Sequence, residues 1–418
     1  MEKPMDYRPT VRACWFGATI MAITCNFTPM LFLHLRDTYG LSYAQLGGLT
    51  FINFLTQVGT DLAFSKAADR YGFRRFVVLG QYLCAAGFLL FASVPWVFSG
   101  AEYAGFLLST VIFSVGAGLQ ELLLSPIIDA TPSENPARAM SLMHSFYAIG
   151  QVVTVVVTTV LMAVFGMERW PLILCGWAVF PIACGTVFLR VPLRQKVSEA
   201  DATPVRTLLR SKIFLLGFVS ILFAGATELA MCQWTSSFLD RALELPKVWG
   251  DILGMAGFAV MMGLGRMLHG VCGEKWRLRP VLIAGFAGAA LCYLTAALTN
   301  VPAAAVIACC MTGLFVSLAW PGALSLAAKA LPMAGASMFA LMAAGGDIGC
   351  AAGPWLSGLL SDAVVRNAAA AVGAGADQLG LRAGLLFGTV FPIGGLIAQL
   401  CLLRMDRLEE KSCEIAKL

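Results

Sequence analysis

Twelve long apolar runs, joined by short polar segments, constrain this chain more than any other feature of its sequence. Each run is about 20 residues long, which is the length that an α-helix needs to cross the hydrocarbon core of a bilayer. Helices are favoured over a β-barrel because the runs are continuous and do not alternate apolar with polar residues. The predicted spans are 12–34, 45–66, 76–95, 103–127, 140–165, 172–191, 213–238, 249–271, 280–298, 302–327, 337–361 and 382–404.

The composition excludes a water-soluble fold. Hydrophobic residues make up 59% of the chain and charged residues 13%, whereas soluble domains are about 25% charged. A soluble fold of this length could not bury so much apolar surface. The sequence therefore predicts an all-α integral membrane protein, with twelve transmembrane helices in two six-helix bundles.

The lysines and arginines predict how the helices are oriented. If both termini are cytoplasmic, 23 of the 29 lysines and arginines fall in cytoplasmic segments, as the positive-inside rule requires. The net charge of +5 then reflects membrane orientation and gives no support to nucleic-acid binding. Residues 1–11 are too short and too polar for a signal peptide, so the first apolar run is expected to remain as a helix.

The longest cytoplasmic linker divides the chain near its middle. It is rich in charged and small polar residues, and the loops on either side of it are short, so successive helices are expected to be antiparallel neighbours. A longer outer loop is expected near 362–381. The predicted organisation is an N-terminal bundle over 1–191, the linker 192–212, a C-terminal bundle over 213–404 and a cytoplasmic tail over 405–418.

A charged motif occurs at corresponding places in the two halves. The first copy reads Asp69-Arg70-Tyr71-Gly72-Phe73-Arg74-Arg75, and a weaker copy includes Gly273-Glu274-Lys275, with Glu274 lying 205 positions after Asp69. Because 205 is close to half of 418, the chain is expected to contain two copies of one membrane unit. Such a duplication is typical of secondary transporters, whose substrate site lies between the repeats.

The first copy carries a resemblance to a known family. From Ser65 to Arg75 it resembles the helix 2–3 loop signature of the major facilitator superfamily, with Ser65 in place of the usual glycine. The resemblance implies a cytoplasmic gate closed by the acidic residue and the basic cluster, and a tight turn that glycine permits. A positive cluster that only sets topology is the alternative. The residues assigned to the gate are Asp69, Arg70, Gly72, Arg74, Arg75, Glu274 and Lys275.

Ionisable side chains in the middle of apolar runs are the strongest candidates for function, because each costs roughly 2.5–3.5 kcal/mol to insert. Glu121 and Glu228 fall on helices 4 and 7, which line the central cavity in major facilitators. Desolvation disfavours the charged form of a carboxyl group, so both are candidates for proton coupling or for binding substrate hydroxyls. Packing through a helix–helix hydrogen bond is the alternative. Asp347 is a weaker candidate, and Asp61 and Arg266, which share a repeat register, are expected to form a gate or packing pair.

Polar and aromatic side chains near these carboxyls indicate a polar ligand with an apolar face. Aromatic rings can stack on sugar faces while amides and carboxylates bind hydroxyls. Anchoring at the lipid interface is the alternative for most of the tryptophans. The candidates for substrate binding are Asn26, Gln120, His144, Tyr147, Gln151, Gln233, Trp234 and Trp320.

Helices 4 and 5 are similar to those of the fucose-permease-like group of sugar–proton symporters. The similarity rests on Gly118-Leu119-Gln120-Glu121 and on His144-Ser145-Phe146-Tyr147. It implies that Glu121 takes part in sugar binding and coupling. Two departures put fucose itself in doubt: Asn26 stands nearest to where that group has an acidic residue, and Tyr147 stands where it has an asparagine.

These patterns predict a secondary active transporter for proton-coupled uptake of a sugar or similar small polar metabolite. A proton-antiport exporter of drugs or metabolites is the alternative, although helix 5 lacks the proline that such exporters often carry. No phosphate loop, metal-ligand cluster or nucleophile motif points to an enzyme. We expect a multi-pass monomer in the cytoplasmic (inner) membrane, with protons, a small solute and lipid as its partners, and neither a metal nor a cofactor.

Overall fold

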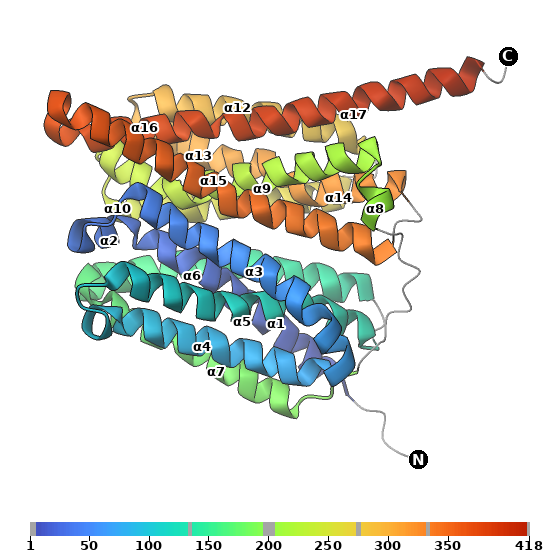
Figure 1. The fold of residues 1–418 in the computed structure, drawn as a ribbon, viewed down its shortest axis with the longest axis horizontal. Coiled ribbons are helices and arrows are strands. Elements are labelled where there is room, and N and C mark those ends of the chain that lie inside the picture. The colour runs from blue at the N-terminus through green and yellow to red at the C-terminus, as the bar shows by residue number, and fades with distance from the viewer. Residues whose placement is uncertain (1–5, 133–135, 195–204, 273–276, 332–334, 416–418) are drawn as a thin grey trace. The chain divides into compact units, whose positions relative to one another are not determined.

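The computed structural model describes residues 6–132, 136–194, 205–272, 277–331 and 335–415. Within these ranges the protein is helical and contains no strand (Figure 1). The chain divides into two compact units, Met1–Ser198 and Glu199–Leu418. The division falls in the range predicted as the linker.

The first unit is a bundle in which the helices run lengthwise beside one another (Figure 1). α4 packs against both α5 and α7, α3 packs against α5, and α1 packs against α6. Buried apolar side chains around Cys14, Phe73, Leu124 and Phe188 form a core that joins these helices. The elements are α1 Arg8–Met30, α2 Phe32–Tyr39, α3 Tyr43–Tyr71, α4 Phe73–Val97, α5 Glu102–Ala130, α6 Pro136–Phe165, η1 Met167–Arg169 and α7 Trp170–Arg190.

The second unit is built around α9, which packs against α15, α16 and α17. α12 packs against α13 and α17, and α11 against α13. The elements are α8 Val205–Leu208, α9 Lys212–Leu243, α10 Lys247–Trp249, the π-helix η2 Gly250–Ala256, α11 Gly257–Cys272, α12 Leu278–Leu298, α13 Pro302–Val316, α14 Ala319–Ala330, α15 Gly335–Val372, η4 Gly373–Gly375, α16 Ala376–Gly388 and α17 Val390–Ile415.

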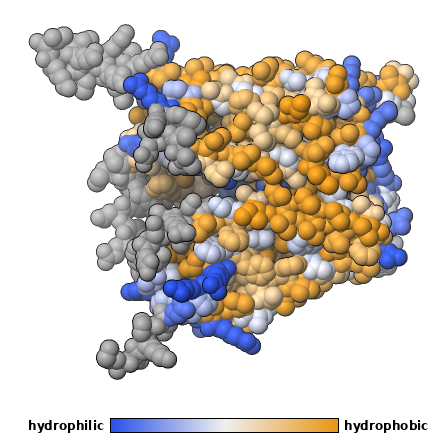
Figure 2. Space-filling model, turned by 180° about the vertical axis from the view of Figure 1, so that it is seen from behind, coloured by the Kyte–Doolittle hydropathy of each residue, from blue (hydrophilic) through white to orange (hydrophobic). Residues whose placement is uncertain are grey.

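The outer surface of the helices is apolar. Leu62, Trp96, Val164 and Leu172 are each about 70% exposed, which is an unfavourable arrangement in water and a favourable one in hydrocarbon. Hydrophobic side chains cover most of the face drawn in Figure 2, and hydrophilic ones gather toward the helix ends. The chain is therefore an integral membrane protein.

In the described residues, ten helices are long and apolar enough to cross a membrane, or eleven if the bent pair α1 and α2 forms one span. α3 is not among them, because its apolar surface is interrupted by Asn53, Gln57 and Asp61. The predicted number of twelve spans and the cytoplasmic location of the termini remain predictions.

The chain bends at the end of α1. Pro29 lies inside the helix, and because its nitrogen carries no hydrogen it cannot donate to the carbonyl one turn earlier. α1 ends at Met30, and α2 continues at an angle of 44° to it. The sequence predicted one span here, over 12–34.

Four other predicted segments differ from the structure. The predicted outer loop at 362–381 is helical instead, because α15 continues to Val372 and α16 begins at Ala376; the run Ala368 to Ala371 has high helix propensity. The predicted span 249–271 begins as the π-helix η2, and the span 302–327 is broken between α13 and α14. α17 also runs on to Ile415, beyond the predicted end at 404.

Candidate functional site

Glu121 lies beside a second carboxyl group, that of Asp61. Their carboxylate oxygens are within 4.8 Å of one another, and both side chains are partly buried. Glu121 lies nine residues before the end of α5, and Asp61 ten residues before the end of α3. At 1.5 Å per residue this is about 15 Å, close to the middle of a hydrocarbon core that is about 30 Å thick.

A glycine allows the two helices to come together at this point. A Cβ atom on Gly118 would lie 2.9 Å from the Cβ of Thr60 and 3.1 Å from the Cα of Gln57, so a larger residue would push α5 away from α3. The close approach brings Asp61 next to Glu121. In the described part of the chain no lysine or arginine forms an ion pair with either carboxyl group, and Asp61 Oδ1 is buried without a hydrogen-bond partner.

One face of α3 continues as a buried polar ladder. Gln57 donates through Nε2 to Asn53 Oδ1 at 2.8 Å, and Ser114 Oγ of α5 donates to the same oxygen at 2.7 Å. Asn53 in turn donates to the carbonyl of Thr24 in α1 at 3.4 Å. The site residues predicted from the sequence do not include Asn53, Gln57 or Ser114. The spacing of Asn53, Gln57 and Asp61 at i, i+4 and i+8 in an apolar helix is the signal that could have revealed this face.

Gln120 is used in packing between α4 and α5. It is fully buried and accepts a hydrogen bond from Gln81 Nε2 at 2.8 Å. Its own Nε2 contacts Cys84 Sγ at 3.1 Å and the carbonyl of Gly116 at 3.4 Å. These contacts occupy both the oxygen and the nitrogen of the Gln120 amide. The geometry therefore gives little support to the predicted contact between Gln120 and substrate.

The other candidates in the first unit lie on α1 and α6. Asn26 is buried and donates to the carbonyl of Ala22 in its own helix at 2.9 Å. Tyr147 is partly buried and Gln151 is buried. The side chain of His144 lies outside the described ones. The substrate-binding role of all four stays a prediction.

In the second unit, Glu228 of α9 has a different neighbour. It is partly buried and interacts electrostatically with Arg266 of α11. Arg266 also donates through Nε to the carbonyl of Ser317 at 3.2 Å. Ser317 stands at the break between α13 and α14, where a helix end leaves carbonyl groups without a helical partner, so Arg266 also satisfies a helix end. Arg266 and Asp61 belong to different units, and their predicted pairing remains a prediction.

Two tryptophans of the candidate set have structural contacts. Trp234 is buried and donates through Nε1 to the carbonyl of Pro354 at 2.9 Å, which ties α9 to α15. Trp320 lies so close to Gly346 that a side chain at Gly346 would collide with its ring. The neighbouring Asp347 is buried, as is Gln233 of α9.

The helix 2–3 motif forms the tight turn that the sequence predicted. Gly72 ends α3 and begins α4 with a φ angle of +93°, which is a conformation that favours glycine. Arg74 donates to the carbonyls of Phe188, Leu189 and Val191 at 2.9, 2.6 and 2.8 Å, and thereby caps the end of α7.

The remaining gate candidates are less defined. The guanidinium of Arg70 lies 5.3 Å from the centre of the Tyr71 ring, and Arg75 is exposed. The side chain of Asp69, and Glu274 and Lys275, lie outside what the structure describes. The gate assignment therefore stays a prediction, and Arg74 has an additional structural function.

Comparison with protein families decides the kind of protein. The family model of the Major Facilitator Superfamily matches residues 14–250, which is more than half of the chain. The chain belongs to the Major Facilitator Superfamily. It is therefore a multi-pass membrane transporter and not an enzyme. The comparison with curated proteins gives no match.

Solved structures share the fold at low sequence identity. A bacterial homologue of the human lysosomal transporter Spinster, inward-facing and unoccupied, is 18% identical with a TM-score of 0.79, covering 96% of this chain and 99% of that one. The nucleoside transporter NupG is 13% identical (TM-score 0.73, 95% and 99% covered). A D-xylose–proton symporter is also 13% identical (TM-score 0.73, 93% and 97% covered). At such identities the likeness concerns the fold alone.

Proposed function

We propose that this major facilitator takes up a sugar or similar small polar metabolite together with protons, and that Glu121 is the coupling carboxyl. The observation that carries the proposal is the approach of Glu121 to Asp61 within 4.8 Å. Two carboxylates this close repel each other strongly in a medium of low dielectric constant. A proton bound between them removes the repulsion, so the pair can take up and release a proton.

Glu228 is the weaker candidate for coupling. Its electrostatic neighbour is Arg266, whose positive charge can balance the carboxylate without a proton. Glu121 has a second carboxyl in that place instead. Glu121 and Asp61 therefore share the coupling proton. Glu228 binds substrate hydroxyls or holds Arg266 in place.

The proposed environment of the protein is the cytoplasmic membrane, where a proton gradient is available. The D-xylose–proton symporter is an example of the same fold with this chemistry. The helix 4 pattern that resembles the fucose-permease-like group adds support for a sugar. We propose a monomer, because the family resemblance places one transport pathway within a single chain.

Accumulation in proteoliposomes tests the proposal. A gradient of one pH unit corresponds to about 1.4 kcal/mol per proton, so symport of one proton per solute permits about tenfold accumulation. Labelled pentoses, hexoses and polyols would be offered from outside, at a lower external than internal pH. Wild type should accumulate one of them by up to about tenfold, and Glu121→Gln should only equilibrate it.

Exchange provides the control. Glu121→Gln should still exchange labelled for unlabelled solute, because exchange needs no net proton movement. Glu228→Gln tests the distinction between the two glutamates, and it should keep some accumulation if it keeps binding. Full accumulation by Glu121→Gln would contradict the proposal, and efflux driven by the same gradient would favour the exporter.

A further inference from the structure

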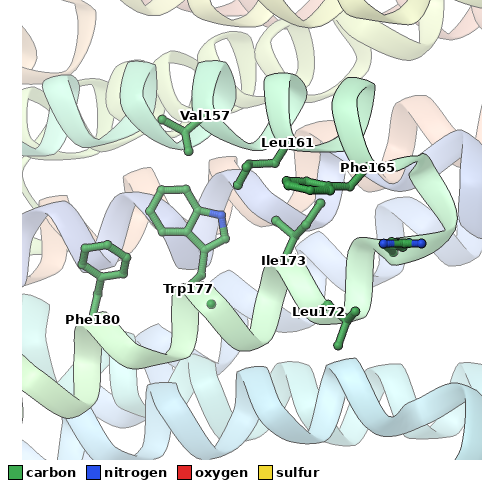
Figure 3. Close-up of a pocket in the computed structure, with 9 residues that line it drawn as sticks. Val157, Leu161, Phe165, Leu172, Ile173, Trp177 and Phe180 are labelled. Carbon is green, nitrogen blue, oxygen red and sulfur yellow. The ribbon is translucent and has the colours of Figure 1, made fainter.

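A groove on the outside of the first unit lies between α6 and α7, apart from the candidate site. It has a volume of about 550 Å³. The α6 side is formed by Val157, Leu161 and Phe165, and the α7 side by Leu172, Trp177 and Phe180 (Figure 3). Val157, Phe165, Leu172 and Phe180 are also among the exposed large apolar side chains. The groove therefore opens to the surroundings of the helices, which in a membrane protein are lipid.

The floor of the groove is open because of a glycine. Gly176 lines it, and a Cβ atom added there would meet no heavy atom within 4 Å. The indole of Trp177 donates through Nε1 to Thr158 Oγ1 at 2.9 Å. Its polar atom is thus satisfied within the protein, and the groove presents apolar surface along its length.

One end of the groove carries a positive charge. Arg169 lines the groove and is exposed. Gly166, with a φ angle of +91°, ends α6 and allows the chain to turn into η1, which places Arg169 at the start of α7. Its guanidinium forms no hydrogen bond or ion pair with any described residue. Glu168, its exposed neighbour, is not part of the lining.

The length of the groove matches one leaflet. Arg169, which directly precedes α7, and Phe180 of α7 lie eleven positions apart in the lining, or about 16 Å. Half of the hydrocarbon core is about 15 Å thick. A single acyl chain could therefore lie along the groove while its headgroup remains at the end that carries Arg169.

We propose that the groove between α6 and α7 binds one anionic phospholipid. Its phosphate contacts the Arg169 guanidinium, which can bind phosphate through two parallel hydrogen bonds. One acyl chain packs against the apolar lining and over Gly176. The proposal does not rest on the proposed transport function, since it concerns a surface outside the candidate site.

Native mass spectrometry of the full-length protein in a non-ionic detergent tests the site. Phosphatidylglycerol and phosphatidylcholine with identical acyl chains would be titrated separately. Wild type should bind one phosphatidylglycerol more tightly than phosphatidylcholine. Arg169→Gln should weaken phosphatidylglycerol binding about fivefold, the effect of one basic residue at a membrane surface, and should leave phosphatidylcholine binding unchanged.

A second variant tests the groove itself. Gly176→Leu fills the open floor of the groove. It should weaken the binding of both lipids about tenfold, which corresponds to the loss of contact by two acyl methylenes. Matched controls are Arg366→Gln, an exposed arginine elsewhere, and Gly263→Leu, another glycine with open space around it; neither should change lipid binding. Equal effects of Arg169→Gln and Arg366→Gln would overturn the proposal. Lipid binding that Gly176→Leu leaves unchanged would also overturn it. So would a wild-type dimer that dissociates in the Gly176→Leu variant, because a second copy of the protein would then occupy the groove.

Discussion

At the scale of single residues, the same type of side chain serves different purposes according to what it faces. Arg74 and Arg266 were both selected as gate residues, yet each also binds main-chain carbonyls at a helix end. Glu121 lies beside a carboxyl group, whereas Glu228 interacts electrostatically with an arginine. The sequence could place these residues in the membrane but could not identify their partners, because the partners lie on helices far away along the chain.

Arg74→Gln should reduce stability. The change removes charge-assisted hydrogen bonds to the carbonyls at the end of α7, and we expect a loss of about 1–3 kcal/mol. Thermal unfolding of the purified protein would measure it. Arg75→Gln is the matched control, since Arg75 is exposed and such surface changes stay within about 0.5 kcal/mol. Equal melting temperatures for the two variants would show that the cap at the end of α7 contributes nothing.

At the scale of helices, the sequence predicted that helices form better than it predicted where a helix is broken or changes type. Apolar runs of about 20 residues correctly predicted a helical membrane protein, while the number of twelve spans stays a prediction. The π-helix η2 and the break between α13 and α14 were not predicted, because each lies within one of the long apolar runs, 249–271 and 302–327. The polar face of α3 was missed for a related reason: its polar residues are spread over three turns and interrupt the apolar run without ending it.

Glycines in α15 allow this helix to pack closely against α9. A Cβ atom on Gly353 would lie 2.7 Å from the carbonyl oxygen of Ala226 in α9, and one on Gly349 would collide with the carbonyl of Leu222. Backbone cannot move aside as a flexible side chain can. The α9–α15 contact therefore depends on these glycines.

Gly349→Ala should destabilise the second unit by about 1–3 kcal/mol, as overpacking does. Gly263→Ala offers a matched control, because nothing lies within 4 Å of its added Cβ atom and alanine has the higher helix propensity. Thermal unfolding should thus show a lower melting temperature for Gly349→Ala and an unchanged or higher one for Gly263→Ala. The same melting temperature for both would contradict the packing argument.

At the scale of the whole molecule, the repeated charged motif and the total length predicted two copies of one membrane unit, and the chain divides into two compact units. Membership of the Major Facilitator Superfamily was anticipated from Ser65 to Arg75. The substrate was not, because it depends on side chains from many helices, and several of those selected, such as Gln120 and Trp234, turn out to be hydrogen-bonded within their own unit.

Asp69→Asn should slow the transport cycle without changing specificity, because the family resemblance gives Asp69 a part in the gate and none in binding. We expect a lower maximal rate of uptake and the same order of preference among competing solutes. Competition assays in proteoliposomes measure both quantities. A changed order of preference would remove Asp69 from the gate and place it in the substrate site.

The most direct test of proton-coupled uptake through Glu121 is the internal pH of proteoliposomes that contain a pH-sensitive dye. Sugars, polyols, organic acids and lipophilic cations would be added one at a time from outside, to wild type and to Glu121→Gln. We expect one sugar or polyol to acidify the interior of wild-type vesicles and to leave Glu121→Gln vesicles unchanged. Equal acidification in the variant, or proton movement only with lipophilic cations, would contradict the proposed function.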